Sequence, residues 1–200
     1  MPDLLQALRA GRVLLMDGAM GTQLQRAGIP PGACYEAWNL THPESIAAIH
    51  RAYVAAGADC LLTNTFQANP AALARHNLGG QMEAIVRAGI DLARAAAGPE
   101  RFVLADVGPV EQPDRHVTAA LLEPLSHADG ILVETCSDLE TVEAVLAAGP
   151  AVPVLLSLTY LRDPAGELRT FRGLTPENAA QQAAALGVAA LGVNCGREIG

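Results

Sequence analysis

The sequence predicts an α/β protein of the (β/α)8 TIM-barrel type, with about six β/α units in its 200 residues. Short, nearly continuous apolar runs alternate with longer Ala-rich segments of 3.6-residue periodicity, as buried parallel strands and their covering helices require. Polar residues follow the apolar runs, where the active sites of barrels lie. A doubly wound open sheet is the alternative, but Gly18 and Gly21 do not complete the phosphate-loop pattern GxGxxG. The sequence therefore favours the barrel.

The strand candidates, taken in order, are six apolar runs. They cover residues 13–17, 59–65, 101–107, 130–134, 152–159 and 189–195. The helix candidates between them cover residues 43–57, 81–98, 117–127, 138–149 and 176–187. Pro43 and Pro176 stand at helix starts, and a glycine ends four of the five helical segments. Strands and helices that alternate in one chain predict parallel pairing with right-handed crossovers.

The length and composition limit the class of protein and its partners. A barrel needs eight units in about 250 residues, so we expect residues 1–200 to form one barrel domain that lacks its last two units. No apolar run approaches the roughly 18 residues of a membrane span, and no secretory leader opens the chain. The formal charge of −8, without a Lys/Arg block, argues against nucleic acid and membranes as partners. We expect a cytoplasmic protein with free or metal-binding cysteines.

Polar side chains at the strand exits are the candidate functional residues. They are Asp17, Thr63, Asn64, Thr65, Asp106, Glu134, Thr159, Asn194 and Cys195. In a barrel these exits share one face, the carboxyl-terminal one. Strand ends are also polar simply because they meet loops and solvent, and this alternative stays open for each residue taken alone.

Three of the exits carry groups with distinct chemistry. After Asp17, the glycines at 18 and 21 let the backbone approach a ligand and offer free amides to a carboxylate, although the same spacing also marks ordinary turns. Glu134 suits an ammonium group, with an ion pair to an arginine as the alternative. Cys195 is a candidate thiolate, with a buried structural cysteine as the alternative. The sequence contains no lysine, which excludes a Schiff-base lysine within these residues.

Five segments in this order resemble the homocysteine S-methyltransferase family over essentially the whole chain. They are DGAMGT at 17–22, IAAIHRAY at 46–53 with AGAD at 56–59, TNTF at 63–66, VET at 133–135 and GVNC at 192–195. The resemblance is strongest to the homocysteine-binding module at the N-terminus of cobalamin-dependent methionine synthase. It implies a barrel enzyme that transfers a methyl group to the thiol of homocysteine and gives methionine.

The resemblance also implies a zinc site and roles for named residues. Three cysteines hold zinc in the family; Cys195 corresponds to the first, and the other two form an adjacent pair that this sequence does not contain. Cys195 and Glu134 would be the catalytic residues, with Glu134 on the amino group of homocysteine. The substrate-binding residues would be Asp17, Gly18, Ala19, Met20, Gly21, Thr63, Asn64, Thr65, Glu134 and Asn194.

The methyl donor stays open at the level of the sequence. The segment between Gly108 and Glu134 is shorter than is usual in the family, which changes the access of the donor. A methylcobalamin domain, methyltetrahydrofolate through such a domain, a betaine or a methylsulfonium compound would each supply the methyl group. The alternatives to the methyltransferase are another TIM-barrel enzyme and a non-catalytic, zinc-free barrel that only binds an amino acid.

Overall fold

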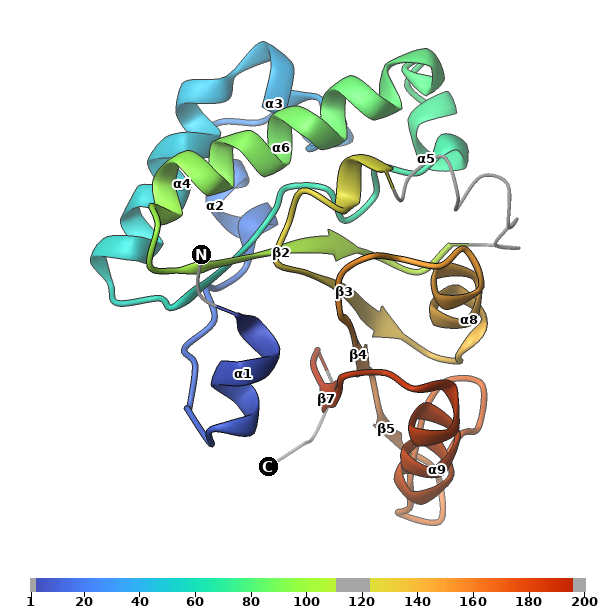
Figure 1. Cartoon of the computed structure of the whole chain (residues 1–200). Coiled ribbons are helices and arrows are strands. Elements are labelled where there is room, and N and C mark those ends of the chain that lie inside the picture. The colour runs from blue at the N-terminus through green and yellow to red at the C-terminus, as the bar shows by residue number, and fades with distance from the viewer. Residues whose placement is uncertain (1–2, 111–122, 196–200) are drawn as a thin grey trace.

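One parallel β-sheet organises the molecule (Figure 1). The computed structural model describes residues 3–110 and 123–195. The strands of the sheet are β1 (Cys60–Leu62), β2 (Phe102–Val107), β3 (Gly130–Cys136), β4 (Val154–Leu158) and β7 (Ala190–Val193), and they lie side by side in this order. All neighbouring pairs are parallel. This sequential parallel order confirms the predicted barrel-type α/β fold.

Helices connect the strands and cover one face of the sheet, whereas the first helix lies on the other face (Figure 1). The longer connecting helices are α4 (Pro43–Ala55), α6 (Met82–Ala97), α8 (Glu140–Ala147) and α9 (Pro176–Leu186). The shorter ones are α2 (Met20–Arg26), α3 (Trp38–Thr41), α5 (Pro70–Ala74) and the 3-10 turn η1 (Gly79–Gln81). The helix on the opposite, inner face is α1 (Leu4–Arg9).

The sheet is apolar on both faces, which explains the continuous apolar runs. On the inner face, Phe102, Leu104 and Leu132 pack against Leu4 and Ala7 of α1. Alternate residues of the same strands point to the outer helices, and each fully buried large side chain contributes about 1.5–3 kcal/mol. Helix α1 thus covers the part of the inner face near the amino-terminal ends of the strands, and polar groups occupy the carboxyl-terminal ends.

The predicted helix boundaries have identifiable physical causes. In α9, the side chain of Thr175 accepts a hydrogen bond from the amide of Asn178, and Pro176 occupies the first turn without losing a bond. The helix ends at Gly187, whose left-handed backbone (φ 81°) suits glycine. Helix α4 begins at Pro43, as predicted.

The prediction of a strand at 13–17 is wrong, because only Met16 forms an isolated parallel bridge, with Cys60. The carbonyl of Leu15 accepts from the amides of both Asp59 and Cys60, while the amide of Leu15 donates to the Asp59 carboxylate at 2.9 Å. A side chain and a doubly used carbonyl therefore replace a regular ladder. The segment still lies beside β1, in the place of the first barrel strand.

Other elements differ in extent. The antiparallel pair β5 (Leu161–Arg162) and β6 (Leu168–Arg169), between β4 and α9, has no counterpart in the sequence-based prediction, nor have α1 and α2. The predicted helix at 117–127 lies mostly outside the described residues, and of it residues 123–125 are helical. Strand β3 extends to Cys136, with a register shift between Val133 and Cys136.

Candidate active site

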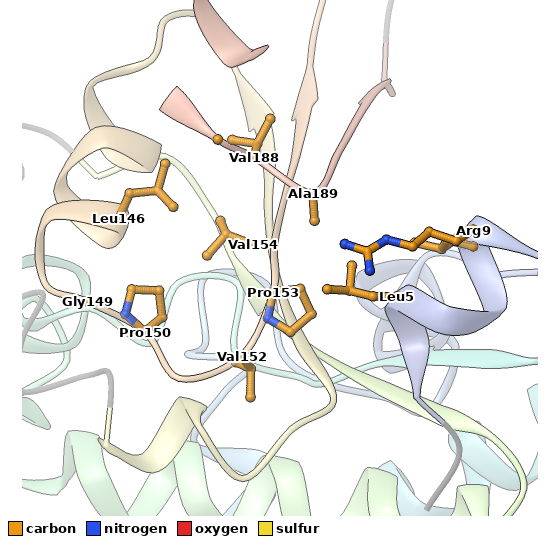
Figure 2. Close-up of a pocket in the computed structure, with 12 residues that line it drawn as sticks. Leu5, Arg9, Leu146, Gly149, Pro150, Val152, Pro153, Val154, Val188 and Ala189 are labelled. Atoms are coloured by element: carbon orange, nitrogen blue, oxygen red, sulfur yellow. The ribbon is translucent and has the colours of Figure 1, made fainter. Parts of the chain in front are cut away.

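Two large cavities lie at opposite ends of the sheet. The cavity in Figure 2, of about 720 Å³, lies between α1 and the residues that lead into β4 and β7, such as Pro153 and Val188. Its lining is apolar apart from Arg9 and contains no carboxylate, histidine or cysteine. The second cavity, of about 670 Å³, lies at the carboxyl ends of the strands and is lined by carboxylates and thiols. Because parallel barrels place their chemistry at the carboxyl ends, the second cavity is the candidate active site.

The lining of this active-site cavity includes most of the predicted residues. From the predicted set it contains Ala19, Met20, Gly21, Thr63, Asn64, Glu134 and Cys195. Four predicted residues are outside the lining. Asp17 and Gly18 directly precede the lining residue Ala19, and Thr65 and Asn194 donate hydrogen bonds to the lining residues Asp106 and Glu134. Asp106, which the sequence placed among the strand exits without a specific role, also lines the cavity, as do Glu36, Cys34 and Thr135, which the sequence analysis did not single out.

Glu134 is held in place by a fixed amide. The side-chain nitrogen of Asn194 donates to Oε2 of Glu134 at 3.1 Å and to Oγ1 of Thr135 at 2.7 Å. The side-chain oxygen of Asn194 accepts from the amide of Thr135 at 3.2 Å and from Oγ of Ser157 at 2.9 Å. All hydrogen-bonding groups of this amide therefore have partners, so its orientation is defined. Asn194, predicted to bind substrate, positions Glu134 in this structure.

The backbone around this network adopts an unusual conformation. Thr135 has φ 58° and Cys195 has φ 51°, in the left-handed region that residues other than glycine rarely occupy. The register shift of β3 between Val133 and Cys136 surrounds Thr135. Glu134 follows Leu132 on the inner face of the strand by ordinary alternation, and the extra residue at the bulge turns Cys136 into the outer core instead.

Asp17 is a second carboxylate at the inner end of the site. Its Oδ2 accepts from the amide of Leu62 at 3.0 Å, and its buried Oδ1 has no partner among the described residues. Burial, more than the charge of Glu134, raises the pKa of Asp17 to about 7, although the Leu62 amide opposes the shift. Burial likewise raises the pKa of Glu134. None of the ion pairs formed by the described residues includes either carboxylate, so neither charge is neutralised by an ion pair within the described part of the chain.

The glycines after Asp17 have packing reasons. A Cβ at Gly18 would lie 2.9 Å from the hydroxyl of Tyr53, which donates to the carbonyl of Ala19 at 3.2 Å. A Cβ at Gly21 would lie 3.2 Å from the ring of Tyr35. Met20 begins helix α2, so the segment turns directly from the strand position into a helix.

Thr63 and Thr65 join the end of β1 to β2. The amide of Asp106 donates to Oγ1 of Thr63 at 3.0 Å, and Oγ1 of Thr65 donates to the carbonyl of Asp106 at 2.7 Å. The two hydroxyls are 2.6 Å apart, and because the Thr65 proton is already used, Thr63 is the donor between them. Both hydroxyls therefore fix the backbone of Asp106.

Asn64 connects the β1 exit to the loop before α3. Its side chain donates to the carbonyl of Tyr35 at 2.8 Å and to Oδ1 of Asn39 at 2.9 Å. Asn39 in turn donates to the carbonyls of Asn64 and Ile85. The same loop carries Glu36, whose Oε1 accepts from an amide at 2.9 Å and whose Oε2 accepts from the Cys34 thiol at 3.5 Å. This loop thereby forms one wall of the cavity.

Cys195 lies exposed at the edge of the cavity, with Sγ 3.6 Å from the side-chain nitrogen of Asn194. Zinc requires three protein ligands at a catalytic site, and residues 3–110 and 123–195 contain no group of three His, Cys, Asp or Glu placed to hold a metal ion. Cys136 is buried in the core, which raises the pKa of its thiol to about 12. The described donors therefore do not make a complete metal site.

Comparison with known proteins relates this geometry to established relatives. Methionine synthase of Mycobacterium leprae is 34% identical over 225 residues, which cover 96% of this chain and 18% of that protein. Methionine synthase of Mycobacterium tuberculosis is 34% identical over 189 residues, which cover 78% of this chain and 16% of that protein. The chain thus spans less than a fifth of the length of these relatives. The metallated crystal structure of the Escherichia coli homocysteine methyltransferase MmuM matches 96% of this chain and 77% of that chain, with a TM-score of 0.77 and 28% identity.

A parallel sheet of sequential strands, with carboxylates and an exposed thiol in a cavity at its carboxyl edge, is the arrangement of barrel enzymes. The family model described as homocysteine S-methyltransferase matches residues 14–199. The chain belongs to the homocysteine S-methyltransferase family. None of the helices in the described parts of the chain is both long and apolar enough to cross a membrane.

Proposed function

We propose that this chain binds homocysteine in the active-site cavity and that the homocysteine thiol is methylated there, which gives methionine. The observation that carries the proposal is the placement of Glu134 and Cys195 in one cavity, with Asp17 buried beside Glu134. This arrangement complements a ligand that carries an ammonium group and a thiol. Family membership and the names of the relatives agree with it.

The residues of the chain have distinct roles in this proposal. Glu134 binds the substrate ammonium group, and Asn194 keeps Oε2 of Glu134 in position. Asp17 adds negative charge at the same end of the cavity, next to the backbone of residues 18–21. Thr63, Asn64 and Thr65 hold the cavity walls through the hydrogen bonds described above. The ammonium group thereby orients the substrate so that its thiol reaches Cys195.

Zinc dependence is part of the proposal, with Cys195 as one thiolate ligand and the further ligands outside the described residues. Bound zinc would keep a coordinated thiol deprotonated at neutral pH. We further propose that residues 1–200 are barrel units one to six of a homocysteine-binding domain in a cytoplasmic protein. The methyl group would come from a cobalamin- or methyltetrahydrofolate-binding domain, or from a small betaine or methylsulfonium donor.

The test compares Cys195→Ser with Cys34→Ser in the intact protein, since both thiols line the cavity. After cobalt replaces zinc, the wild-type protein should show thiolate-to-cobalt absorption that changes when homocysteine is added. Cys195→Ser should lose metal and this change, and Cys34→Ser should keep both. Absence of homocysteine binding by the wild-type protein, or metal binding that is indifferent to Cys195→Ser, would contradict the proposal.

A zinc-free barrel that only binds an amino acid is the second candidate. It is favoured by the incomplete donor set within the described residues. Metal analysis of the intact protein separates the two candidates, because the binding module would contain no stoichiometric zinc and would give no methionine with any donor.

A further inference from the structure

Asp106 is a deeply buried carboxyl group of the active-site cavity. It is 6% exposed, and its Oδ1 has no hydrogen-bond partner among the described residues, although the side chain lines the cavity. An ionised buried carboxylate without partners is costly, so a group of this kind indicates a missing ligand. No role proposed so far uses this side chain.

The backbone of Asp106 is fixed, so its carboxyl group has a defined place. Thr63 accepts from its amide, and Thr65 donates to its carbonyl. Along β2, Phe102 and Leu104 point to the inner face of the sheet, and Asp106 is the next residue in this alternation. Asp106 therefore lies on the inner face of the sheet, one step toward the carboxyl end from the apolar side chains of Phe102 and Leu104.

Three carboxyl groups meet at this level. Asp106 lies in the electrostatic range of Glu134 and Asp17, and more weakly of Glu36; these charges add to the effect of burial and raise the pKa of Asp106 well above its usual range. The ion pairs among the described residues include none of the four carboxylates. Two of the acceptor atoms, Oδ1 of Asp17 and Oδ1 of Asp106, are buried without partners. A primary ammonium group brings one positive charge and three N–H donors, so it would offset the charge of this cluster while it donates to Asp106 and Glu134, the two carboxylates of the three that line the cavity.

We propose that Asp106 is a third ammonium-binding residue, which together with Asp17 and Glu134 selects a substrate with a primary ammonium group. This inference rests on the proposed function, in which that substrate is homocysteine. Glu36 does not belong to the ammonium site, because both of its oxygens already accept hydrogen bonds within the protein.

The test measures the binding of two ligands to the intact protein by calorimetry: L-homocysteine and 4-sulfanylbutanoic acid, which has the same skeleton without the amino group. Asp106→Asn should weaken homocysteine binding about 10- to 100-fold, as the loss of a charged hydrogen bond predicts, and should leave the desamino ligand unchanged. Asp106→Ser, which removes the carboxylate and leaves only a shorter hydroxyl, should weaken homocysteine binding at least as much and serves as the second variant if Asp106→Asn folds poorly. Glu36→Gln, which removes the same charge from the same cavity, is the matched control and should lose less than threefold.

The outcomes are distinguishable. A loss confined to homocysteine and to the Asp106 variants supports the inference. Equal losses for both ligands, or no loss in either Asp106 variant while the wild-type protein binds homocysteine, overturn it and leave the proposed function intact. If the wild-type protein does not bind homocysteine, the proposed function fails, and the inference fails with it.

Discussion

Replacement of Asp17 by asparagine should stabilise the protein at high pH. Folding raises the pKa of Asp17 from 3.8 to about 7, mainly through burial. Between pH 3.8 and about 7, the folded state holds a proton that the unfolded chain has released. Ionisation of Asp17 therefore costs the folded state no stability below pH 3.8, and this loss of stability grows until the pH passes 7. At about 1.4 kcal/mol per pKa unit, the ionised folded form is destabilised by about 4 kcal/mol at pH 8. The neutral amide keeps an oxygen for the Leu62 amide and avoids this penalty.

Urea unfolding of the intact protein at several pH values measures this effect. Asp17→Asn should exceed the wild type by up to about 4 kcal/mol at pH 8, and the difference should shrink steadily toward pH 4. The half-buried Asp163 is the matched control, because hydrogen bonds from the amides of Glu167 and Ala165 lower its pKa, and Asp163→Asn should destabilise rather than stabilise at neutral pH. A difference between Asp17→Asn and wild type that does not change with pH would refute the reasoning.

Three further predictions concern buried groups. Burial lowers the pKa of His50 from 6.5 to about 4, so the free energy of unfolding should fall by about 3 kcal/mol as the pH drops from 6.5 to about 4. His50→Leu should abolish this part of the pH dependence in urea unfolding. Gly108→Ala should destabilise the protein by about 2 kcal/mol or more in thermal melts, because the added Cβ would lie 2.7 Å from the backbone oxygen of Phe66. Gly79→Ala is the control and should change the melting temperature little, because the space around Gly79 is open. Asn194→Ala should raise KM for homocysteine about tenfold by freeing Glu134, and Asn194→Gln should not restore it; an unchanged KM would remove the positioning role.

The sequence predicted all five strands of the sheet, and it also predicted a strand at 13–17 that the structure does not form. The runs that contain β2 and β3 are apolar because the connecting helices cover their outer face and α1 covers their inner face. Residues 13–17 have the same pattern, but their pairing depends on the Asp59 side chain, which no apolar pattern encodes. Helix α1 was missed because its six residues show too little periodicity.

The candidate site was predicted in part for a similar reason. Glu134 and Cys195 stand in recognisable segments at strand exits, and the structure places both in the lining of one cavity. Glu36 comes from a loop, where spacing carries no signal of a cavity. Asp106 does stand at a strand exit, and only its unpartnered burial distinguishes it from an ordinary polar strand end.

The left-handed backbone at Thr135 has a consequence for laboratory evolution. Threonine at φ 58° costs about 1–3 kcal/mol, which glycine would largely avoid, yet the Thr135 hydroxyl accepts a hydrogen bond from Asn194 at 2.7 Å. A library selected only for thermal stability should therefore enrich glycine at position 135. Under the proposed function, a library selected for growth without methionine should retain threonine. The difference in glycine frequency at position 135 between the two selections would show how the stability lost to the left-handed threonine compares with the functional value of its hydroxyl.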